Sequence, residues 1–387
     1  MLVVDEITKS LLTLFNKNDF KGHDPFDYLN SKLFNLTPFK YSKICKLIFT
    51  QLGKRSFLNF RKLLLIPKSR NIKGIALVVL GLIEDYKRTN DQFYLDKAKN
   101  LVNWLLANTS DKNKWKYNCW GYNFEWQAKA FNVPLGTPNI VTTYFASLAI
   151  YKLGLLINDN SLQEQALNSA FFMQEHLMRK VNNNYVFNYV PNYDAFVHNA
   201  NLFGAYWCLL SGKINNDRDL VDKSISAIEF TINDQNSDGS WVYGHQSHHK
   251  WIDSFHTGYN LELVNEINKI LDISKYREVI NLGYQYYLEK FITMDGRVKY
   301  FNNSLYPLDV HSYAQAIITI KRLDPSNTDL LNKIVKSLIK EMYLEKKKRF
   351  SYQKGKFFKN NINYFRWTQA WAYYSLSFYN NQLNEKN

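Results

Sequence analysis

The chain has 387 residues, and its hydrophobic fraction of 46% supports a substantial buried core. It carries 49 Lys+Arg against 34 Asp+Glu, a formal net charge of +15, which would attract anionic partners such as acidic glycans, nucleic acid or a membrane surface. The same excess can also reflect compositional bias, because the lysines are spread over many predicted faces. Three cysteines, an odd number without close spacing, exclude a disulfide framework.

The chain shows no sign of export or membrane insertion. Asp5 and Glu6 stand where a secretory signal would carry Lys or Arg. The longest apolar run, residues 74–83, is too short for a bilayer, which a helix spans with about 20 residues. We therefore expect a cytoplasmic protein without a transmembrane segment.

One pattern recurs along the chain: an apolar or aromatic residue, any residue, then Tyr. It ends at Tyr117, Tyr189, Tyr243, Tyr300 and Tyr352, at intervals of 72, 54, 57 and 52 residues. An interval in the fifties fits one helical hairpin with a sizeable loop, so the pattern indicates a tandem array.

Unusually apolar segments alternate with segments that have a single apolar stripe. Residues 202–210, for example, are apolar around the whole helix, which predicts burial on every side. The predicted inner helices are 71–86, 139–153, 198–210, 253–267, 309–320 and 366–378. The predicted outer, amphipathic helices are 41–52, 93–106, 162–177, 220–232, 274–291 and 330–343.

Six buried helices alternating with six amphipathic ones predict an all-α fold, an (α/α)6 toroid with short β-hairpin-like loops at the cavity mouth. An open superhelix is the alternative, but it would need polar caps at its ends, and the last inner helix is as apolar as the middle ones. We expect residues 1–387 to form a single domain, with residues 1–40 a helical extension packed on the ring.

Several segments carry a family resemblance. Residues 235–241, QNSDGSW, resemble the QW motif of triterpene cyclases, and the periodic plan is similar to the α/α-toroid superfamily, which includes terpenoid cyclases, six-hairpin glycosidases, polysaccharide lyases and uronyl C5-epimerases. Residues 24–31, 120–127 and 137–143 resemble toroid proteins of bacterial surface-polysaccharide clusters, such as those for capsule or lipopolysaccharide. The resemblance implies a carbohydrate-active protein.

The sequence departs from the terpenoid-cyclase branch of that superfamily. It has neither the Asp-x-Asp-Asp motif of triterpene cyclases nor the Asp-Asp-x-x-Asp motif of class I terpene synthases. Three scattered cysteines do not supply the zinc ligands of prenyltransferases or lanthionine cyclases. The QW-like turn is therefore interpreted as a structural joint, because a fold does not by itself transfer function.

The loop before the second inner helix is the densest in aromatic and polar residues. Trp120, Tyr122 and Trp126 give it the composition of a sugar-binding surface, with flat faces for pyranose rings; a packed lid is the alternative. Glu125 is the preferred carboxylate, because Phe124 and Trp126 could desolvate it and raise its pKa toward that of a general acid. Tyr122 is a second catalytic candidate.

The other candidates lie near the starts of the inner helices, which should converge on one cavity mouth and offer free N–H groups to anions. His256 follows Asp253 by one turn and could be oriented by it as a general base, whereas Asn139, Asp253 and Asp309 could instead be helix caps. Asp253, His256 and Asp309 are candidate catalytic residues. The candidate substrate-binding residues are Trp120, Trp126, Asn139, His198, Asn199, Trp241, Tyr243, Trp251, His311, Gln315, Arg366, Gln369 and, at the first helix entrance, Arg70.

A cluster of histidines raises a metal hypothesis. His245, His248, His249 and His256 fall within a dozen positions, but their spacing matches no zinc pattern and no cysteine accompanies them. We predict no metal and no cofactor, with hydrogen bonding in the cavity as the role of these residues.

Two classes of function fit these observations. The first is an enzyme of surface-polysaccharide metabolism that acts on an acidic oligosaccharide or polysaccharide, as a lyase, epimerase or glycoside hydrolase. Proton abstraction beside a uronate carboxylate needs a His or Tyr base and a cation such as Arg366, and hydrolysis needs two carboxylates, for which Glu125 with Asp253 or Asp309 is available. The second is a non-catalytic glycan-binding or assembly protein with the same aromatic cavity. No nucleic-acid partner is expected, and the oligomeric state is open.

Overall fold

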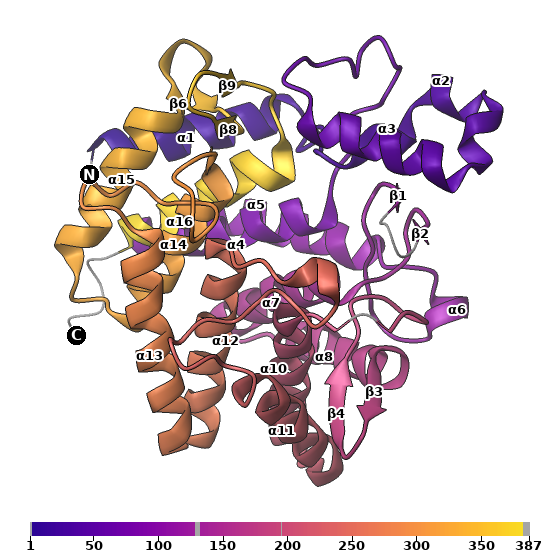
Figure 1. Cartoon of the computed structure of the whole chain (residues 1–387), viewed down its shortest axis with the longest axis vertical. Helices are drawn as coiled ribbons and strands as arrows, with labels where there is room; N and C mark the ends of the chain where they lie inside the picture. The colour runs from indigo at the N-terminus through magenta and orange to yellow at the C-terminus, as the bar shows by residue number, and fades with distance from the viewer. Residues whose placement is uncertain (1, 128–131, 195, 382–387) are drawn as a thin grey trace.

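Six helices form a closed inner ring in the computed structural model, which describes residues 2–127, 132–194 and 196–381 (Figure 1). Each inner helix contacts the next along the chain, and the last contacts the first. The predicted (α/α)6 toroid is confirmed, with boundaries within a few residues of those expected. The inner helices are α4 (Ile72–Thr89), α7 (Ile140–Leu156), α10 (His198–Ile214), α12 (Ser254–Leu271), α14 (Val310–Leu323), and α16 (Trp371–Asn380), which continues the π-helical turn η6 (Phe365–Ala370).

The outer layer pairs one amphipathic element with each inner helix. The elements that follow their inner helices are α5 (Gln92–Ala107), α8 (Asn160–Leu167) with α9 (Ser169–Phe172) and η3 (Met173–Leu177), α11 (Arg218–Ile232), α13 (Ser274–Phe291) and α15 (Thr328–Met342). The sixth place is taken by α1 (Leu2–Lys17), which packs on α16. The two ends of the chain therefore form the hairpin that closes the ring.

The expected outer helix 41–52 is wrong in its placement. These residues form α3 (Lys43–Arg55), which contacts η1 (Asp27–Asn30), η2 (Pro38–Tyr41) and β1 (Trp126–Gln127) rather than an inner helix. With α2 (Lys32–Asn35) it projects at one corner of the molecule beside β1 (Figure 1). The apolar stripe of α3 was mistaken for a ring contact, because a sequence pattern does not show which surface a stripe faces.

Short antiparallel pairs connect the hairpins, as predicted. These are β1 with β2 (Asn132–Val133), β3 (Met178–Val181) with β4 (Asn184–Phe187), β5 (Leu308–Asp309) with β8 (Gln353–Lys354) and β9 (Lys359–Asn360), and β6 (Tyr343–Leu344) with β7 (Arg349–Phe350). Three single turns complete the list: α6 (Lys112–Trp115), η4 (Ser247–His249) and η5 (Glu345–Lys347). None of the helices described is both long and apolar enough to cross a membrane.

The recurring Tyr has a structural explanation. In three successive hairpins its backbone carbonyl accepts a hydrogen bond from the first residue of the inner helix of the same hairpin, which satisfies one of the free N–H groups at a helix start. The three bonds are Ile140 N to Tyr189 O at 3.0 Å, His198 N to Tyr243 O at 3.2 Å and Ser254 N to Tyr300 O at 2.9 Å. The repeat thus fixes each loop to the mouth of the ring.

The QW-like turn is a structural joint. Trp241 is buried, and its indole Nε1 donates to Thr231 O at 3.0 Å, while the Gln235 side chain donates to Gly239 O at 3.1 Å. Gly239 has φ +89°, and a Cβ added there would lie 2.4 Å from Leu282 O. Both the backbone conformation and the close approach require glycine at this position.

Candidate functional site

The starts of the inner helices bring polar side chains to one end of the ring. Asn71, Asn139, Asp253 and Asp309 are all N-caps, and the side chain of each accepts a backbone N–H two or three residues on, at 2.8 to 3.1 Å. The capping interpretation of the predicted column is therefore correct. Capping occupies one oxygen of each carboxylate and leaves the other oxygen of Asp253 and Asp309 free to bind another group.

A buried ion pair joins the N-terminal segment to the last inner helix. Arg366 donates from Nε and Nη2 to the two carboxylate oxygens of Asp24, at 2.6 and 2.8 Å, and both side chains are 4% exposed. The guanidinium carbon also lies 4.9 Å from the ring centre of Tyr122. Because Asp24 uses the fork of Arg366, this arginine is not available to clamp the carboxylate of a substrate, as the sequence suggested.

His256 and Asp253 form an oriented pair, as predicted from their spacing. The Nδ1 atom of His256 lies 2.8 Å from Asp253 Oδ2 and 3.0 Å from Oδ1. The side chain of Asp253 is fully buried, whereas that of His256 is 19% exposed. Because the carboxylate holds Nδ1, Nε2 is the nitrogen of this partly exposed imidazole that could act as a general base.

Two aromatic rings flank this imidazole. Tyr243 and Trp251 are stacked on one another, with ring centres 4.3 Å apart and planes at 13°. Their centres lie 4.5 and 5.5 Å from that of His256. Both rings are only partly buried, so they offer an apolar face beside the base.

A second histidine lies deeper in the ring. His311 is stacked between Phe255 and Trp371, and its Nε2 lies 2.6 Å from the hydroxyl oxygen of Tyr259. Burial holds the pKa of His311 well below its usual value, which keeps the imidazole neutral. Lys73 Nζ lies 3.4 Å from the same hydroxyl, and burial likewise holds the pKa of Lys73 well below the usual range.

Asp309 is a buried carboxyl group with several donors around it. Gln353 Nε2 lies 2.7 Å and Trp367 Nε1 3.4 Å from its Oδ2. Burial raises the pKa of Asp309 to about 7. A group that titrates near neutral pH can hold a proton in the resting protein, which is one requirement for a general acid.

Lys54, from α3, is the cation that faces these carboxylates. Burial lowers its pKa, while the charges of Asp309 and Asp253 act in the opposite direction. Its side chain is partly exposed and its Nζ lies over the Phe26 ring, and within the described part of the chain it makes no ion pair. This group, rather than Arg366, is placed to meet an added anion.

The mouth is roofed rather than open, which corrects the expectation of a deep central cavity. The Phe26 ring lies 5.7 Å from that of Trp367 and 6.4 Å from that of Trp126, and Lys54 Nζ lies 5.2 Å above it. Beneath the mouth, the void lined by residues such as Tyr259 and Gln315 measures about 10 Å³, at the limit of room for one water molecule. Aromatic side chains fill the axis of the ring.

Several predicted residues have structural partners that preclude the expected role. Trp120 is fully buried with its Nε1 on Leu105 O at 2.8 Å, so neither it nor the buried Trp241 can stack on a sugar. Glu125 pairs with Lys46 Nζ at 2.5 Å and accepts from Asn132 Nδ2 at 2.8 Å. Both contacts occupy the carboxylate, so Glu125 is not the free group that the proposed role as general acid requires.

Other predicted residues lie away from the mouth or serve the scaffold. Arg70 binds Asp19 on the outer side, and Gln369 clamps the backbone of Phe350 through both side-chain atoms, at 2.8 and 3.0 Å. Gln315 donates to Glu262 inside the ring at 2.9 Å. Asn199 is buried.

Tyr122, Tyr189 and Trp126 lie together at the mouth. The hydroxyl oxygens of Tyr122 and Tyr189 are 3.1 Å apart, and the ring centres of Tyr189 and Trp126 are 6.0 Å apart. Tyr122 is therefore engaged by Tyr189 on one side and by Arg366 on the other. These contacts give Tyr122 a structural role in the packing of the mouth, and they do not support its predicted catalytic role.

Sequence reasoning missed three residues of this region, Lys54, Lys73 and Tyr259, and did not foresee that Asp24 pairs with Arg366. The signal for Lys73 was its position as the one charged residue of the apolar segment 71–83. A lysine at the start of a helix that is buried all round either has a specific environment or would not be tolerated. Lys54 gave no such signal, because it lies in a helix whose placement was wrong.

One cleft lies outside the mouth. It measures about 440 Å³ and is lined by α1 residues such as Phe15, by Lys62 and Ile66, and by Phe365 and Gln369. Of the predicted site residues, Gln369 alone lines it within the described part of the chain. The predicted chemistry is therefore not located there.

Comparisons with solved structures identify the class of fold. No family model matches the chain, and no curated protein is similar to it in sequence. Cellobiose 2-epimerase from Bacillus thermoamylovorans matches with a TM-score of 0.65 at 11% identity, covering 98% of this chain and 99% of that one. A GH76 α-mannanase from Bacteroides thetaiotaomicron matches with a TM-score of 0.60 at 14% identity, covering 81% of this chain and 86% of that one. An unsaturated glucuronyl hydrolase from Bacillus sp. GL1 matches with a TM-score of 0.57 at 14% identity, covering 78% of this chain and 83% of that one.

The chain therefore shares the α/α-toroid fold of these structures. Identities of 11 to 14% establish a shared fold and no more. Which reaction this ring supports has to be argued from its own residues.

Proposed function

We propose that the protein is a carbohydrate-active enzyme, with His256 as the general base and Asp253 as the residue that orients it. The observation that carries the proposal is the buried Asp253 carboxylate, which holds a partly exposed imidazole at 2.8 Å at the mouth of the ring. Similar folds among epimerases and glycoside hydrolases support a sugar as the substrate.

The rings beside His256 support the same class of substrate. Trp251 and Tyr243 offer a partly exposed aromatic face next to the base, which suits the apolar face of a pyranose. In this proposal the sugar stacks on Trp251, and His256 Nε2 removes a proton from a ring carbon next to a carbonyl or carboxylate carbon. The electron pair of the broken C–H bond passes to that group as an enolate.

The finer proposal is an acidic substrate and proton abstraction, as in an epimerase or lyase. Lys54 supplies the positive charge that stabilises an enolate or holds a uronate carboxylate. Asp309, whose pKa is raised to about 7, is the candidate proton donor. Hydrolysis by two carboxylates is less well supported, because Glu125 is paired with Lys46. A role in bacterial surface-polysaccharide metabolism, which the sequence resemblance supports, and a cytoplasmic location both belong to this proposal.

Deuterium exchange tests the reaction directly. The protein is incubated in heavy water with uronate-containing oligosaccharides, and incorporation at the ring carbon is followed by NMR while absorbance reports an unsaturated product. We expect exchange by the wild type and a loss of at least about 100-fold in His256→Ala. His248→Ala is the matched control, because His248 is an exposed histidine of the same loop. Equal exchange by the His256 and His248 variants would refute the role of His256.

Lys54→Met tests the acidic substrate. We expect binding of a uronate oligosaccharide to weaken by up to about 5-fold and binding of its neutral counterpart to stay unchanged, since an exposed charge interaction contributes at most about 1 kcal/mol. Calorimetry of both ligands measures the difference. An equal effect on the two ligands would remove the carboxylate from the proposal while leaving the His256 result intact.

A non-catalytic glycan-binding protein is the second candidate, and the roof over the mouth favours it. Phe26 and Lys54 cover the converging side chains, and the ring axis beneath them is filled. Binding without exchange, turnover or product, in the wild type and in His256→Ala alike, would decide for this alternative.

A further inference from the structure

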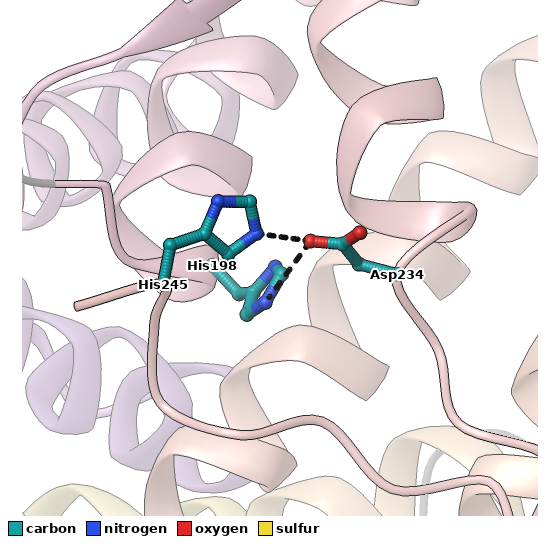
Figure 2. Close-up of side chains that lie close together, drawn as sticks. All are labelled: His198, Asp234 and His245. Carbon is teal, nitrogen blue, oxygen red and sulfur yellow. Dashed lines mark hydrogen bonds and ion pairs between the residues drawn. The ribbon is translucent and has the colours of Figure 1, made fainter. Parts of the chain in front are cut away.

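A buried histidine and two exposed ligand-type residues converge beside the third hairpin (Figure 2). His198 begins α10, Asp234 follows α11, and His245 lies in the loop after Trp241. Their nearest ligand atoms, one from each residue, all lie within 4.8 Å of one another. The cluster shares only His245 with the predicted histidine group, and its other two members, His198 and Asp234, were not part of that group.

The fold brings these residues together through the backbone. Val197 and Gly244 form an antiparallel bridge, and His198 N donates to Tyr243 O at 3.2 Å. The loop containing His245 is thereby held against the start of α10. The convergence is therefore built by main-chain bonds and does not depend on the flexible side chains themselves.

Both imidazoles face the same carboxylate oxygen of Asp234, as the dashed lines in Figure 2 show. His245 Nε2 hydrogen-bonds Asp234 Oδ2, and His198 Nε2 lies 3.7 Å from the same oxygen. His198 is 1% exposed, and within the described part of the chain its Nε2 has no hydrogen-bond partner. A buried nitrogen without a donor or acceptor is costly, and an ion in front of it would resolve that cost.

The far side of the His198 ring is also arranged as in a metal ligand. Its Nδ1 lies 3.4 Å from Thr231 Oγ1, and Asn201 Nδ2 donates to that hydroxyl at 2.9 Å. Metal-binding histidines commonly donate their second N–H to such a fixed acceptor, which fixes the tautomer and the ring orientation. With Nδ1–H directed to Thr231, the lone pair of Nε2 faces Asp234.

We propose that His198, Asp234 and His245 bind a divalent first-row transition metal ion, with Zn²⁺ as the preferred ion. Two imidazoles and one carboxylate are donors that suit Zn²⁺, and three protein ligands leave one tetrahedral position for water or another ligand. Donors around such an ion lie about 3.3 Å apart, given bonds of about 2.0 Å. The exposed His245 and Asp234 can adjust to that spacing, and the ion can enter from their side.

Two features of the surroundings oppose or constrain the binding of an ion. Lys250 is the nearby cation, and its charge disfavours an ion at this point. Phe196 and Phe230 pack on the ring of His245, with centres 4.5 and 5.5 Å away, and limit how far this ring can move to meet an ion. A bound ion would link the loop of His245, which continues to Trp251 and Asp253, to the third hairpin.

Metal titration of the full chain tests the site. The protein, with any affinity tag removed, is stripped with a chelator and titrated with Zn²⁺ or Co²⁺ by calorimetry. We expect one ion per chain for the wild type and for His248→Ala, the matched control. His245→Ala and Asp234→Asn should each weaken binding by at least about 10-fold. Because both residues are exposed, folding should be retained, which circular dichroism checks.

Two results would overturn the site. Absence of Zn²⁺ and Co²⁺ binding by the wild type would show that the three residues form a hydrogen-bonded cluster without a metal. Binding that is unchanged by both substitutions would place the ion on other residues.

A second and independent observation concerns the surface of the projecting N-terminal segment. Residues 31–65, including α2 and α3, expose many large apolar side chains, and Phe57 contacts Phe358 of a neighbouring loop, which extends the same patch. The exposed members are Leu33, Leu36, Phe39, Tyr41, Ile44, Ile48, Leu52, Phe57, Leu58, Phe60, Leu63, Leu65, Phe357 and Phe358. Large apolar side chains exposed together in one segment are typical of an interaction surface.

The charge of the same segment identifies the occupant. Residues 31–70 contain ten Lys and Arg and no Asp or Glu. Three of these cations already pair with carboxylates elsewhere in the chain, Lys46 with Glu125, Arg61 with Asp27 and Arg70 with Asp19. The others include the exposed Lys32, Lys43, Lys62 and Lys68. A second copy of the chain would present the same positive charge to this surface, and two such patches would repel. Exposed apolar side chains mixed with basic ones instead match the interface of an anionic bilayer.

We infer that this patch docks on the surface of a membrane that contains anionic lipid. Ile44 and Ile48, one turn apart on α3, would enter the headgroup boundary, while Lys40 and Lys43 would meet the lipid phosphates. Because α3 contacts β1, docking would place the mouth of the ring close to the membrane.

Co-sedimentation with vesicles tests the docking surface. We expect binding to vesicles of phosphatidylglycerol and phosphatidylcholine, weak binding to phosphatidylcholine alone, and loss of binding at high salt. Removing Lys40 and Lys43 should weaken binding about fivefold for each lysine. Ile44→Glu with Ile48→Glu should abolish it. Met294→Glu, which changes an exposed apolar residue outside the patch, is the control.

The alternatives have distinct results. A dimer by light scattering that Ile44→Glu dissociates, without vesicle binding, would assign the patch to self-association. Equal binding to vesicles with and without phosphatidylglycerol would likewise refute the docking proposal. Unchanged binding of the variant with Ile44→Glu and Ile48→Glu would refute it as well.

Discussion

The buried pair of Asp24 and Arg366 makes a quantitative prediction about stability. Asp24→Asn keeps the shape of the side chain but leaves the guanidinium charge in a site that is 4% exposed. Breaking a buried pair by removing one partner costs about 3 to 5 kcal/mol, because the remaining charge is neither solvated nor compensated. The two bonds of 2.6 and 2.8 Å and the stacking of Arg366 on Tyr122 place this pair at the upper end of that range.

Urea unfolding, followed by tryptophan fluorescence at pH 7, measures the effect. Asp19→Asn is the matched control: Asp19 also pairs with an arginine, Arg70, but its side chain is 59% exposed, so its loss should cost less than about 1 kcal/mol. Replacing both members of the buried pair, as Asp24→Asn with Arg366→Met, should recover part of the loss because no unpaired charge remains.

The comparison with Asp19 decides whether this reasoning is correct. Similar unfolding midpoints for Asp24→Asn and Asp19→Asn would refute the claim that burial sets the strength of the pair. A double variant no more stable than Asp24→Asn would show that the lost free energy comes from packing and not from an unpaired charge.

Three further predictions follow from local geometry. Gly239→Ala should destabilise the protein by more than about 1 kcal/mol in the same urea assay, because the added Cβ meets a backbone carbonyl as well as backbone strain. Gly136→Ala is the control: at φ +75° and without neighbours within 4 Å, it should cost only its backbone strain of about 1 kcal/mol. Equal effects would contradict the close contact at the QW-like turn. Asp309 keeps its proton up to about pH 7 in the folded protein but loses it near pH 3.8 in the unfolded chain. The free energy of unfolding should therefore fall as the pH rises between these values, by at most about 4 kcal/mol. Asp309→Asn should remove that decline, and unfolding at pH 5 and pH 8 will show whether it persists. Cys45 should be the thiol that reacts with a disulfide reagent in the folded protein, since burial raises the pKa of Cys119 to about 12; a Cys45→Ser variant that still reacts would exclude this.

The ring could be predicted because every hairpin repeats one pattern. Helices such as α7 and α10 are apolar all round, and the recurring Tyr marks where each loop returns to the mouth. The closure of the ring could not be predicted in detail. The partner of the last inner helix is α1, at the opposite end of the sequence, and no periodicity connects segments so far apart.

Predictions about the site succeeded where the interaction was local in sequence. His256 and Asp253 are one helical turn apart, so their contact followed from helix geometry alone. Arg366 failed as a substrate clamp because its partner, Asp24, lies at the other end of the chain. Glu125 failed for the same reason, since Lys46 comes from the misplaced helix α3.

The charged side chains at the mouth indicate which kind of ligand the site would accept. Inner helices that begin at one end direct their N–H groups and positive dipole ends to the same place, which favours carboxylates there. The protein supplies three of its own: Asp253 orients His256, Asp309 caps α14, and Asp24 neutralises Arg366. Lys54 remains as a partly exposed cation without an ion pair among the described residues, because the cation beside it is already matched. An anionic sugar could therefore form a direct ion pair with Lys54, on which Asp309 and Asp253 act only at longer range, and a neutral sugar could not.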